Sequence, residues 1–509
     1  LYDGLLQIDL PVNCNIIAYA DDALILIKGE DIQTITEKAN STLKIISKWG
    51  INNKLHFNPH KTTAMLVTKK KNVDVPLIKF NSEYIQTVSH FTYLGVVIDS
   101  RMLFRLHFDN LAKKASKFHS SLVRAAKPTW GLNSDILRII YHGAFEPSIL
   151  YCTSALRNIL DKKWAQKKLL QIQRGFILRI TQAFRTISTD AALIIAGIAP
   201  LYLTAIARTE LLSYKQGKLF LDEGVQYEIE QRANFLSLGH PRNHLHPVVN
   251  SRCLCKHDVY IYTDGSRTQG EDGKSFVGCA FTAFNNGTEI FYSKYRLAPV
   301  CSVYQAELFA ILQAIRWSTI NKTNSCILSD SQAALLSVRN NRNLHPIALD
   351  IRSEFKNHNN HICLSWVRGH TGIVGNERAD ELAKEAASAD IPYSYIKCPI
   401  SYIKCKMKEH ITSNWNSHWS ASDKGSVTKN LFFPQCYIFP VTVQHNFELT
   451  PKCKSLSAVP ENSGQVAAHS RFRFARHKTR LMGLTSQDVV PTVTDAAACQ
   501  SARVAGLSN

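Results

Sequence analysis

Apolar residues repeat along this chain with two periods, and the two periods separate regions of strand from regions of helix. Residues 16–27 hold two β-prone apolar runs that meet at Asp21-Asp22, which predicts a hairpin with two carboxylates at its tip. Residues 31–49 carry apolar side chains at helical spacing. The first part of the chain is therefore expected to mix strands with helix.

Between residues 101 and 235 the helical period dominates, and the predicted helices carry basic faces, one of them with Lys113, Lys114 and Lys117. A solvated helix face has the same pattern, so these lysines leave open whether the region binds a polyanion. The longest uncharged run, residues 191–207, is interrupted by Gly197 and Pro200. The interruption predicts a turn between two helices rather than a membrane span.

Residues 236–256 combine Gly, Pro, His and Asn without an apolar period, which predicts a linker. Over residues 257–390 the pattern predicts three strands, with an Asn286-Gly287 turn between the second and third, and then helix, strand, helix, strand and helix. We therefore expect an α/β domain with a mixed five-stranded sheet flanked by helices. A helical extension is predicted over 391–440, and the tail over 441–509 has no interpretable pattern.

Four carboxylates in the predicted α/β domain share a setting that suits metal binding. Asp264 and Asp330 each follow a β-prone run, and Gly265-Ser266 after Asp264 is a turn signal, so both acids are expected at strand ends. Glu307 and Asp380 border the apolar stripes of two predicted helices, and Asn376 can cap the second helix. One such acid is usually a cap or a solvated side chain, but four acids at one sheet edge repel each other unless cations hold them together. Oxygen ligands favour Mg²⁺ or Mn²⁺, and two such ions could direct water against a phosphodiester.

His370 is a fifth candidate, because it follows a predicted strand and lies in a loop between Gly369 and Gly372. A lone histidine is usually structural, but a mobile histidine beside metal-bound carboxylates is well placed to move protons. We therefore expect His370 to assist turnover without being a metal ligand.

Four short motifs carry a resemblance to a known family: Thr263-Asp264-Gly265-Ser266, Gln305-Ala306-Glu307-Leu308, Ser329-Asp330-Ser331, and the stretch from Trp366 through His370 to Asp380. In order and spacing they resemble the four blocks of a type 1 ribonuclease H domain. The resemblance implies two Mg²⁺ or Mn²⁺ ions held by Asp264, Glu307, Asp330 and Asp380, with His370 assisting turnover. The implied substrate is the RNA strand of an RNA–DNA hybrid. Integrase and transposase cores share the fold, but the helix of Glu307 and the loop of His370 argue against them.

The N-terminal region carries a second resemblance. Tyr19-Ala20-Asp21-Asp22 is similar to the metal-binding hairpin of reverse transcriptases, and the blocks over residues 31–95 look like those of LINE-like, non-LTR retrotransposon polymerases. The resemblance implies a fragment of a Pol protein, with a partial palm over 1–100, a helical thumb or connection over 101–235 and the ribonuclease H domain over 257–390. Asp21 and Asp22 would form a truncated polymerase site, which we expect to be inactive alone because a further metal ligand from an upstream strand is needed.

Composition agrees with a multi-domain protein that binds nucleic acid. The 509 residues are 45% hydrophobic and carry 60 Lys plus Arg against 40 Asp plus Glu, a net charge of +20. This balance suits folded domains with a polyanionic partner, and we expect RNA–DNA hybrid and other nucleic acid, but no membrane, as partners. The residues expected to contact nucleic acid are Ser266, Asn376, Lys113, Lys114 and Lys117.

Thirteen cysteines occur without paired zinc-site spacing, which indicates a reducing compartment. We therefore expect an intracellular protein, nuclear or cytoplasmic.

Two functions remain open from the sequence. The first is metal-dependent endonucleolytic hydrolysis of the RNA strand of RNA–DNA hybrids, as part of a retrotransposon reverse-transcriptase polyprotein. The second is a decayed copy that binds nucleic acid through its basic surface without catalysis. The complete set of candidate catalytic residues favours the first, and the tail without a pattern favours the second. The carboxylates argue against a purely structural protein.

Overall fold

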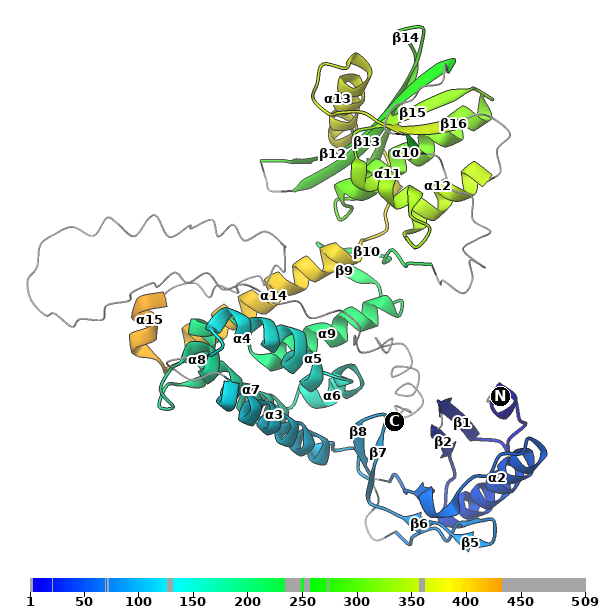
Figure 1. The fold of residues 1–509 in the computed structure, drawn as a ribbon, viewed down its shortest axis with the longest axis vertical. Helices are drawn as coiled ribbons and strands as arrows, with labels where there is room; N and C mark the ends of the chain where they lie inside the picture. Colours follow the sequence, from blue (N-terminus) through cyan, green and yellow to red (C-terminus); the bar gives the residue numbers. More distant parts are fainter. Residues whose placement is uncertain are drawn as a thin grey trace, which may run out of the picture.

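The computed structural model describes residues 3–20, 22–68, 70, 73–125, 131–233, 249–250, 257–271, 274–356 and 362–432. Along the chain these residues form a small N-terminal body, a helical bundle and an α/β domain (Figure 1). Separate hydrophobic clusters fill the three bodies. The predicted multi-domain α/β class is confirmed.

The N-terminal body is built from a hairpin and one long helix, preceded by the short α1 (Asp3–Leu6). Strand β1 (Cys14–Tyr19) pairs antiparallel with β2 (Asp22–Ile27), as the two apolar runs predict. Helix α2 (Ile32–Asn52) begins where the Asp31 side chain accepts a hydrogen bond from the backbone N–H of Thr34. Its apolar stripe packs against the short strands that follow.

Those short elements are η1 (Pro59–Lys61), β3 (Thr63–Ala64), β4 (Lys79–Phe80), β5 (Glu83–Tyr84) and β6 (Gln86–Thr87). They lead to a second hairpin of β7 (His90–Tyr93) and β8 (Val96–Asp99). Leu94 and Gly95 both have positive φ at its turn, a backbone conformation that glycine adopts at little cost.

The helical bundle has one core, centred on Tyr141, Phe145 and Phe176. Its elements are α3 (Arg105–Ala125), α4 (Ser134–Ile140), η2 (Tyr141–Phe145), α5 (Glu146–Ile149), η3 (Thr153–Leu156), α6 (Arg157–Leu160), α7 (Lys163–Thr181), α8 (Thr189–Ala196) and α9 (Leu201–Lys215).

The predicted break within residues 191–207 is confirmed. Helix α8 ends at Gly197, which has a φ of 62°, and α9 begins after Pro200 at an angle of 65° to α8. Among the described residues no single helix is long and apolar enough to cross a membrane, and only this bent pair meets the length and composition together.

The α/β domain contains a mixed sheet of seven strands in the order β11-β16-β15-β12-β13-β14-β17. The five predicted strands form its centre, namely β12 (Val259–Gln269), β13 (Ser275–Asn285), β14 (Thr288–Leu297), β15 (Ser325–Ser329) and β16 (Ile362–Trp366). Two short strands extend its edges, β11 (Val249–Asn250) and β17 (Tyr393–Tyr395). Asn286 and Gly287, both with positive φ, close the predicted hairpin between β13 and β14.

Helices cover both faces of this sheet (Figure 1). Helix α10 (Val303–Ile320) lies on one face with α11 (Gln332–Arg339) and α12 (Pro346–Lys356), and α13 (Val374–Ser388) lies on the other. The pattern predicted one helix between the fourth and fifth strands, whereas the structure has two. The helical segment is interrupted at residues 340–345, because the side chains of Asn340 and Asn343 accept hydrogen bonds from the backbone N–H groups of Arg342 and His345 there.

Two segments outside the predicted α/β domain contact it. One packs on its sheet, and the other connects it to the helical bundle. The hairpin of β9 (Phe220–Asp222) and β10 (Val225–Tyr227) shares a core with β13 and α10. Helix α14 (Ile400–Ala421) runs from the α/β domain to the helical bundle, where Trp415 and Trp419 are buried in the bundle core (Figure 1). The short α15 (Ser426–Phe432) follows. The predicted tail over 441–509, and the predicted linker apart from β11, lie outside the described residues.

Candidate active site

Asp264 lies in the middle of β12 and pairs with Ala280 of β13. The prediction that Asp264 ends a strand is therefore wrong, because pairing with β13 carries β12 on to Gln269. On its other side β12 pairs with β15 only as far as Thr263 and Ser329. Asp264 thus lies one residue past the parallel pairing, level with Asp330, which directly follows β15.

The start of α10 approaches β12 closely at Gly265. A Cβ atom at this position would lie only 2.6 Å from the backbone nitrogen of Glu307. The helix begins with a capping box, in which Ser302 and Gln305 exchange side-chain and backbone hydrogen bonds. The absent side chain of Gly265 therefore lets the first turn of α10 place Glu307 beside Asp264.

Three acids meet at this point. Asp264, Glu307 and Asp330 each offer one carboxylate oxygen, and these oxygens all lie within 4.8 Å of one another. Asp264 and Glu307 are each only 7% exposed. The Oε2 atom of Glu307 is buried and has no hydrogen-bond partner among the described residues. A buried acceptor without a donor is costly unless a cation or water binds it.

Asp380 lies on α13 at the border of this group and is half-buried. Its Oδ2 atom forms an ion pair with Lys384 at 2.7 Å, one turn further along the helix. Asp380 is not among the three acids within 4.8 Å, yet its charge raises the pKa of both Asp264 and Glu307. The structure thus brings three of the four predicted ligands together and places the fourth beside them.

Asn376 contacts the acid group directly. Its Nδ2 atom donates a hydrogen bond to Oδ2 of Asp330 at 3.3 Å, and its side chain is buried. The prediction that Asn376 caps the helix is wrong, since α13 begins at Val374 with Ile373 as the N-cap residue. Close contact of Gly375 with the Tyr262 ring brings this first turn onto the sheet, so Asn376 reaches Asp330 instead.

Crowding and burial raise the pKa of two of these acids. Burial raises the pKa of Asp264 to about 7, and the charges of Asp330 and Asp380 add to the effect. The pKa of Glu307 is raised well above its usual range, chiefly by burial and then by Asp264 and Asp330. In such a group of carboxylates, the protonated or cation-bound forms are favoured over ionised carboxylates with no bound cation.

The raised pKa of Asp264 predicts an unusual stability profile without metal. Because the folded protein binds this proton more tightly than the unfolded chain does, its stability should fall as the pH rises from about 4 to about 7. Asp264→Asn should remove much of this loss, so at pH 8 without divalent ions the variant should melt at a higher temperature than the wild type. Melting curves at pH 5 and pH 8 test this, and equal curves for both proteins would contradict it. Added Mg²⁺ should stabilise only the wild type appreciably.

His370 is exposed in the turn between β16 and α13 and has a φ of 53°. A Cβ atom on the preceding Gly369 would lie 2.6 Å from Oδ2 of Asp330. The loop of His370 therefore contacts the acid group through its backbone, and the imidazole extends from a residue next to that contact.

The other predicted site residues lie in different settings. Ser266 is half-buried on β12 opposite Gly278. Lys113, Lys114 and Lys117 are exposed on α3, and Lys114 donates to the backbone carbonyl of Ser148. Their contacts with nucleic acid stay predictions.

The predicted polymerase carboxylates lie at the first hairpin. Asp22 begins β2, where it pairs with Tyr19, and Asp21 lies outside the described residues. Burial raises the pKa of Tyr93 on β7, and the charge of Asp22 adds to this effect.

Three contributors were missed by sequence reasoning: the contact role of Gly265, the bond from Asn376 and the ion pair of Lys384. Glycine directly after Asp264 was interpreted as a turn, although a glycine within a strand also marks close approach of another backbone. Lys384 follows Asp380 by four residues, a spacing that predicts an ion pair on a helix.

The acid group fits hard divalent cations. All its donors are carboxylate oxygens, and one of them, Oε2 of Glu307, is buried without a hydrogen-bond partner among the described residues. Oxygen donors of this kind suit Mg²⁺ or Mn²⁺ better than softer metals.

Two family models match the chain. The model for reverse transcriptase (RNA-dependent DNA polymerase) matches residues 2–98, and the model for RNase H matches residues 256–388. The second match contains all four acids and His370.

Two relatives of this chain are proteins of type-1 retrotransposable elements. A putative 115 kDa protein of the element R1DM from Drosophila melanogaster is 30% identical over 205 residues, which are 40% of this chain and 20% of that protein. A retrovirus-related Pol polyprotein from element R1 2 of Nasonia vitripennis is 28% identical over 208 residues, 40% of this chain and 51% of that protein. The chain thus spans between a fifth and about half of the length of these relatives.

Two solved structures align with part of the chain. The RNase H domain of PFV is 19% identical with a TM-score of 0.24, and the match covers 26% of this chain and 97% of that domain. RNase H1 from Halobacterium salinarum is 20% identical with a TM-score of 0.22, covering 26% of this chain and 97% of that enzyme. The strand order of the sheet and the match to the RNase H family model over residues 256–388 assign the RNase H fold to this domain.

Proposed function

We propose that this chain hydrolyses the RNA strand of RNA–DNA hybrids with divalent metal ions. The premise is that the chain is a LINE-like, non-LTR retrotransposon Pol protein with a ribonuclease H domain. One observation carries the proposal. Three carboxylates, those of Asp264 on β12, Glu307 on α10 and Asp330 just after β15, each place one oxygen within 4.8 Å of the others, and Asp264 and Glu307 are buried. A ribonuclease H domain supports cleavage of RNA–DNA hybrids in general. Our proposal adds that this chain is active and that its activity depends on metal ions.

Asp264, Glu307, Asp330 and Asp380 would hold two Mg²⁺ or Mn²⁺ ions. When bound, such ions activate the attacking water and stabilise the departing 3′ oxygen of the phosphodiester. Asn376 holds the carboxylate of Asp330 in place through its hydrogen bond. Lys384 forms an ion pair with Asp380 and so balances part of the negative charge of the acid group. The protein thus supplies a preorganised anionic site.

The substrate would approach through its sugar-phosphate backbone. The net charge of +20 favours a polyanion of any sequence. The exposed lysines of α3, together with Ser266 on β12 and Asn376 on α13, are the contacts we propose for nucleic acid. An RNA–DNA hybrid forms inside cells, so we propose an intracellular site of action, nuclear or cytoplasmic.

A cleavage assay tests this function. The purified chain should cut the RNA strand of an end-labelled RNA–DNA hybrid when Mg²⁺ or Mn²⁺ is present, and EDTA should stop the reaction. DNA duplex and single-stranded RNA of the same sequence serve as controls and should stay intact. Hybrid binding without cleavage at any metal concentration would favour the alternative of a decayed copy that only binds nucleic acid.

His370→Ala should slow hybrid cleavage by about 10²–10⁴-fold, the usual contribution of a positioned acid or base. The reason is that His370 extends from the loop whose Gly369 contacts Asp330, while its ring lies outside the acid group. The Mg²⁺ concentration that gives half-maximal rate should change little. Rates measured across Mg²⁺ concentrations decide between the roles, because a metal ligand would show a loss of metal affinity as large as the loss of rate.

A further inference from the structure

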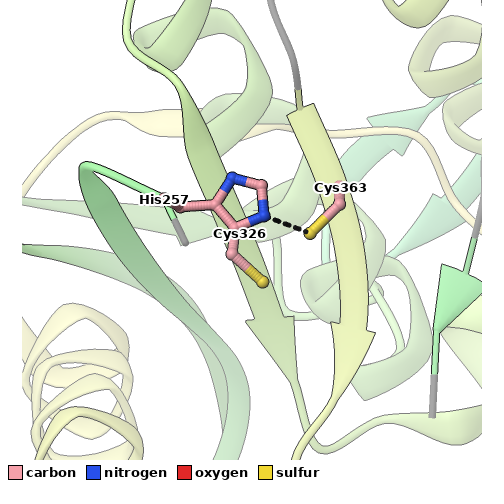
Figure 2. Close-up of side chains that lie close together, drawn as sticks. All are labelled: His257, Cys326 and Cys363. Carbon is pink, nitrogen blue, oxygen red and sulfur yellow. Dashed lines mark hydrogen bonds between the residues drawn. The ribbon is translucent and has the colours of Figure 1, made fainter. Parts of the chain in front are cut away.

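A second group of metal-binding side chains lies at the opposite ends of the same strands. His257 precedes β12, Cys326 is the second residue of β15 and Cys363 is the second residue of β16. Figure 2 shows the three side chains gathered together, with an imidazole nitrogen directed at the sulfur of Cys363. Asp330 instead follows the last residue of β15. The two groups are therefore separated by the length of that strand.

Strand register brings the two cysteines together. Cys326 and Cys363 are direct partners in the parallel pair of β15 and β16, and partners in adjacent strands project to the same side of a sheet. Ile327 and Leu364, the next residue on each strand, point into the core beneath α10. Both thiols therefore project from the other face, where Cys326 is fully buried and Cys363 is half-buried.

The imidazole of His257 is held by Asn324. Its Nδ1 atom lies 2.9 Å from Oδ1 of Asn324, an acceptor, so Nδ1 carries the proton in this arrangement. The lone pair is then on Nε2, which lies 3.3 Å from Sγ of Cys363. The backbone carbonyl of Asn324 also accepts hydrogen bonds from the N–H groups of Asp258 and Val259. A metal-binding histidine is commonly oriented by a hydrogen bond from its other nitrogen in this way.

Two thiolates and one imidazole form a donor set for Zn²⁺ and not for Mg²⁺. With the usual bond lengths, ligand atoms of a tetrahedral zinc site lie about 3.5–3.8 Å apart. The three donor atoms here all lie within 4.8 Å of one another, so small side-chain rotations are enough to bind an ion. Two thiolates also balance the charge of Zn²⁺, which makes the site neutral and suits its burial.

We propose that His257, Cys326 and Cys363 bind one Zn²⁺ ion, with water in the fourth position. The ion joins His257, two residues before β12, to β15 and β16, and so ties together the amino ends of three adjacent strands. The site is separate from hybrid cleavage, since its ligands differ in type and position from the carboxylates. A disulfide between Cys326 and Cys363 is the competing chemistry for the same two sulfur atoms.

Metal titration of the full chain, reduced and stripped of metal, tests the proposal. Co²⁺ should bind with the ultraviolet charge-transfer absorption of thiolate ligands, one equivalent of Zn²⁺ should displace it, and Zn²⁺ should raise the melting temperature. Cys363→Ser and His257→Gln alter partly exposed side chains and should each weaken Zn²⁺ binding by at least about 100-fold, since losing even an outer hydrogen bond costs 10–100-fold. Circular dichroism confirms that each variant is folded.

Three control variants locate the ion. Cys405→Ser removes an exposed thiol on α14 and should leave binding unchanged. Asp330→Asn should also keep the thiolate absorption, which separates this site from the carboxylates. Cys253→Ser/Cys255→Ser, altering the two cysteines that shortly precede His257 in sequence, should retain binding, and its loss would overturn the three-residue site.

Two further outcomes would also refute the proposal. One is thiolate absorption that persists in both Cys363→Ser and His257→Gln. The other is a reduced wild-type chain that binds no Zn²⁺ while mass spectrometry of the untreated protein finds Cys326 linked to Cys363. Hybrid cleavage in Mg²⁺ is measured in parallel, and its failure would leave the zinc result standing.

Discussion

Asp330→Asn is expected to reduce hybrid cleavage by at least about 10³-fold, because a lost metal ligand removes several kcal/mol of transition-state stabilisation. Asparagine keeps the shape of the side chain and an oxygen that can accept the bond from Asn376, but it removes the negative charge. The charge of Asp330 raises the pKa of Asp264 and Glu307, so its removal relieves repulsion. The variant should therefore be folded, and at pH 8 without metal at least as stable as the wild type.

Single-turnover cleavage of a labelled hybrid measures the loss, and thermal melting measures stability. Asp390→Asn is the matched control, because Asp390 is a fully exposed acid of the same domain with one long contact to Arg296 at 3.7 Å. The control should cleave at the wild-type rate. Substantial cleavage by folded Asp330→Asn would remove Asp330 from the catalytic group, whereas equal losses in both variants would point to a general effect of charge.

Gly265→Ala is expected to damage both stability and activity. The added Cβ would lie 2.6 Å from the nitrogen of Glu307 and 2.9 Å from the carbonyl carbon and the Cβ of Ala306. Backbone atoms cannot rotate away, so α10 must shift from the sheet, at a cost of about 1–3 kcal/mol for overpacking. The shift carries Glu307 with it, and a misplacement of about 1 Å can cost about 10²-fold in rate.

Two other glycines of the domain serve as comparisons for this variant. Gly287→Ala places a methyl group in open space at a turn residue with a φ of 80°, so it should cost some stability through backbone strain but leave cleavage unchanged. In Gly278→Ala the Cβ would lie 2.3 Å from the nitrogen of Ala387 on α13, and this change should displace Asp380 rather than Glu307. Melting temperature and cleavage rate are measured for all three. Wild-type behaviour of Gly265→Ala would show that the approach of α10 to β12 is not needed.

Features that depend on residues close together along the chain could be predicted from the sequence. Alternating apolar residues and the Asn286-Gly287 pair predict the β13–β14 hairpin, because this turn needs two residues with positive φ. Helical spacing of apolar residues over residues 31–49 predicts α2, which the structure places at Ile32–Asn52. The four acid-containing motifs likewise identified the ribonuclease H domain, since residue type and spacing are both readable along the chain.

Contacts between residues far apart in the sequence became visible only in the folded structure. Asp264 was expected at a strand end because Gly265-Ser266 resembles a turn, but pairing with β13 extends β12 beyond it. Asn376 was expected as a cap, and the packing of α13 on the sheet directs it to Asp330 instead. In both cases a local signal was overridden by pairing or packing with a partner far away in the sequence.

Helix α14 and the pair of cysteines in β15 and β16 show the same difference between local pattern and tertiary contact. Apolar periodicity predicts a helix containing Trp415 and Trp419, but it does not say that both are buried in the bundle formed by residues more than two hundred positions earlier. Spacing along the chain gave no zinc signal for Cys326 and Cys363, which become neighbours only through the register of β15 and β16. Periodicity encodes which side of an element is apolar, whereas the register of strands and the docking of helices decide which distant side chains meet on that side.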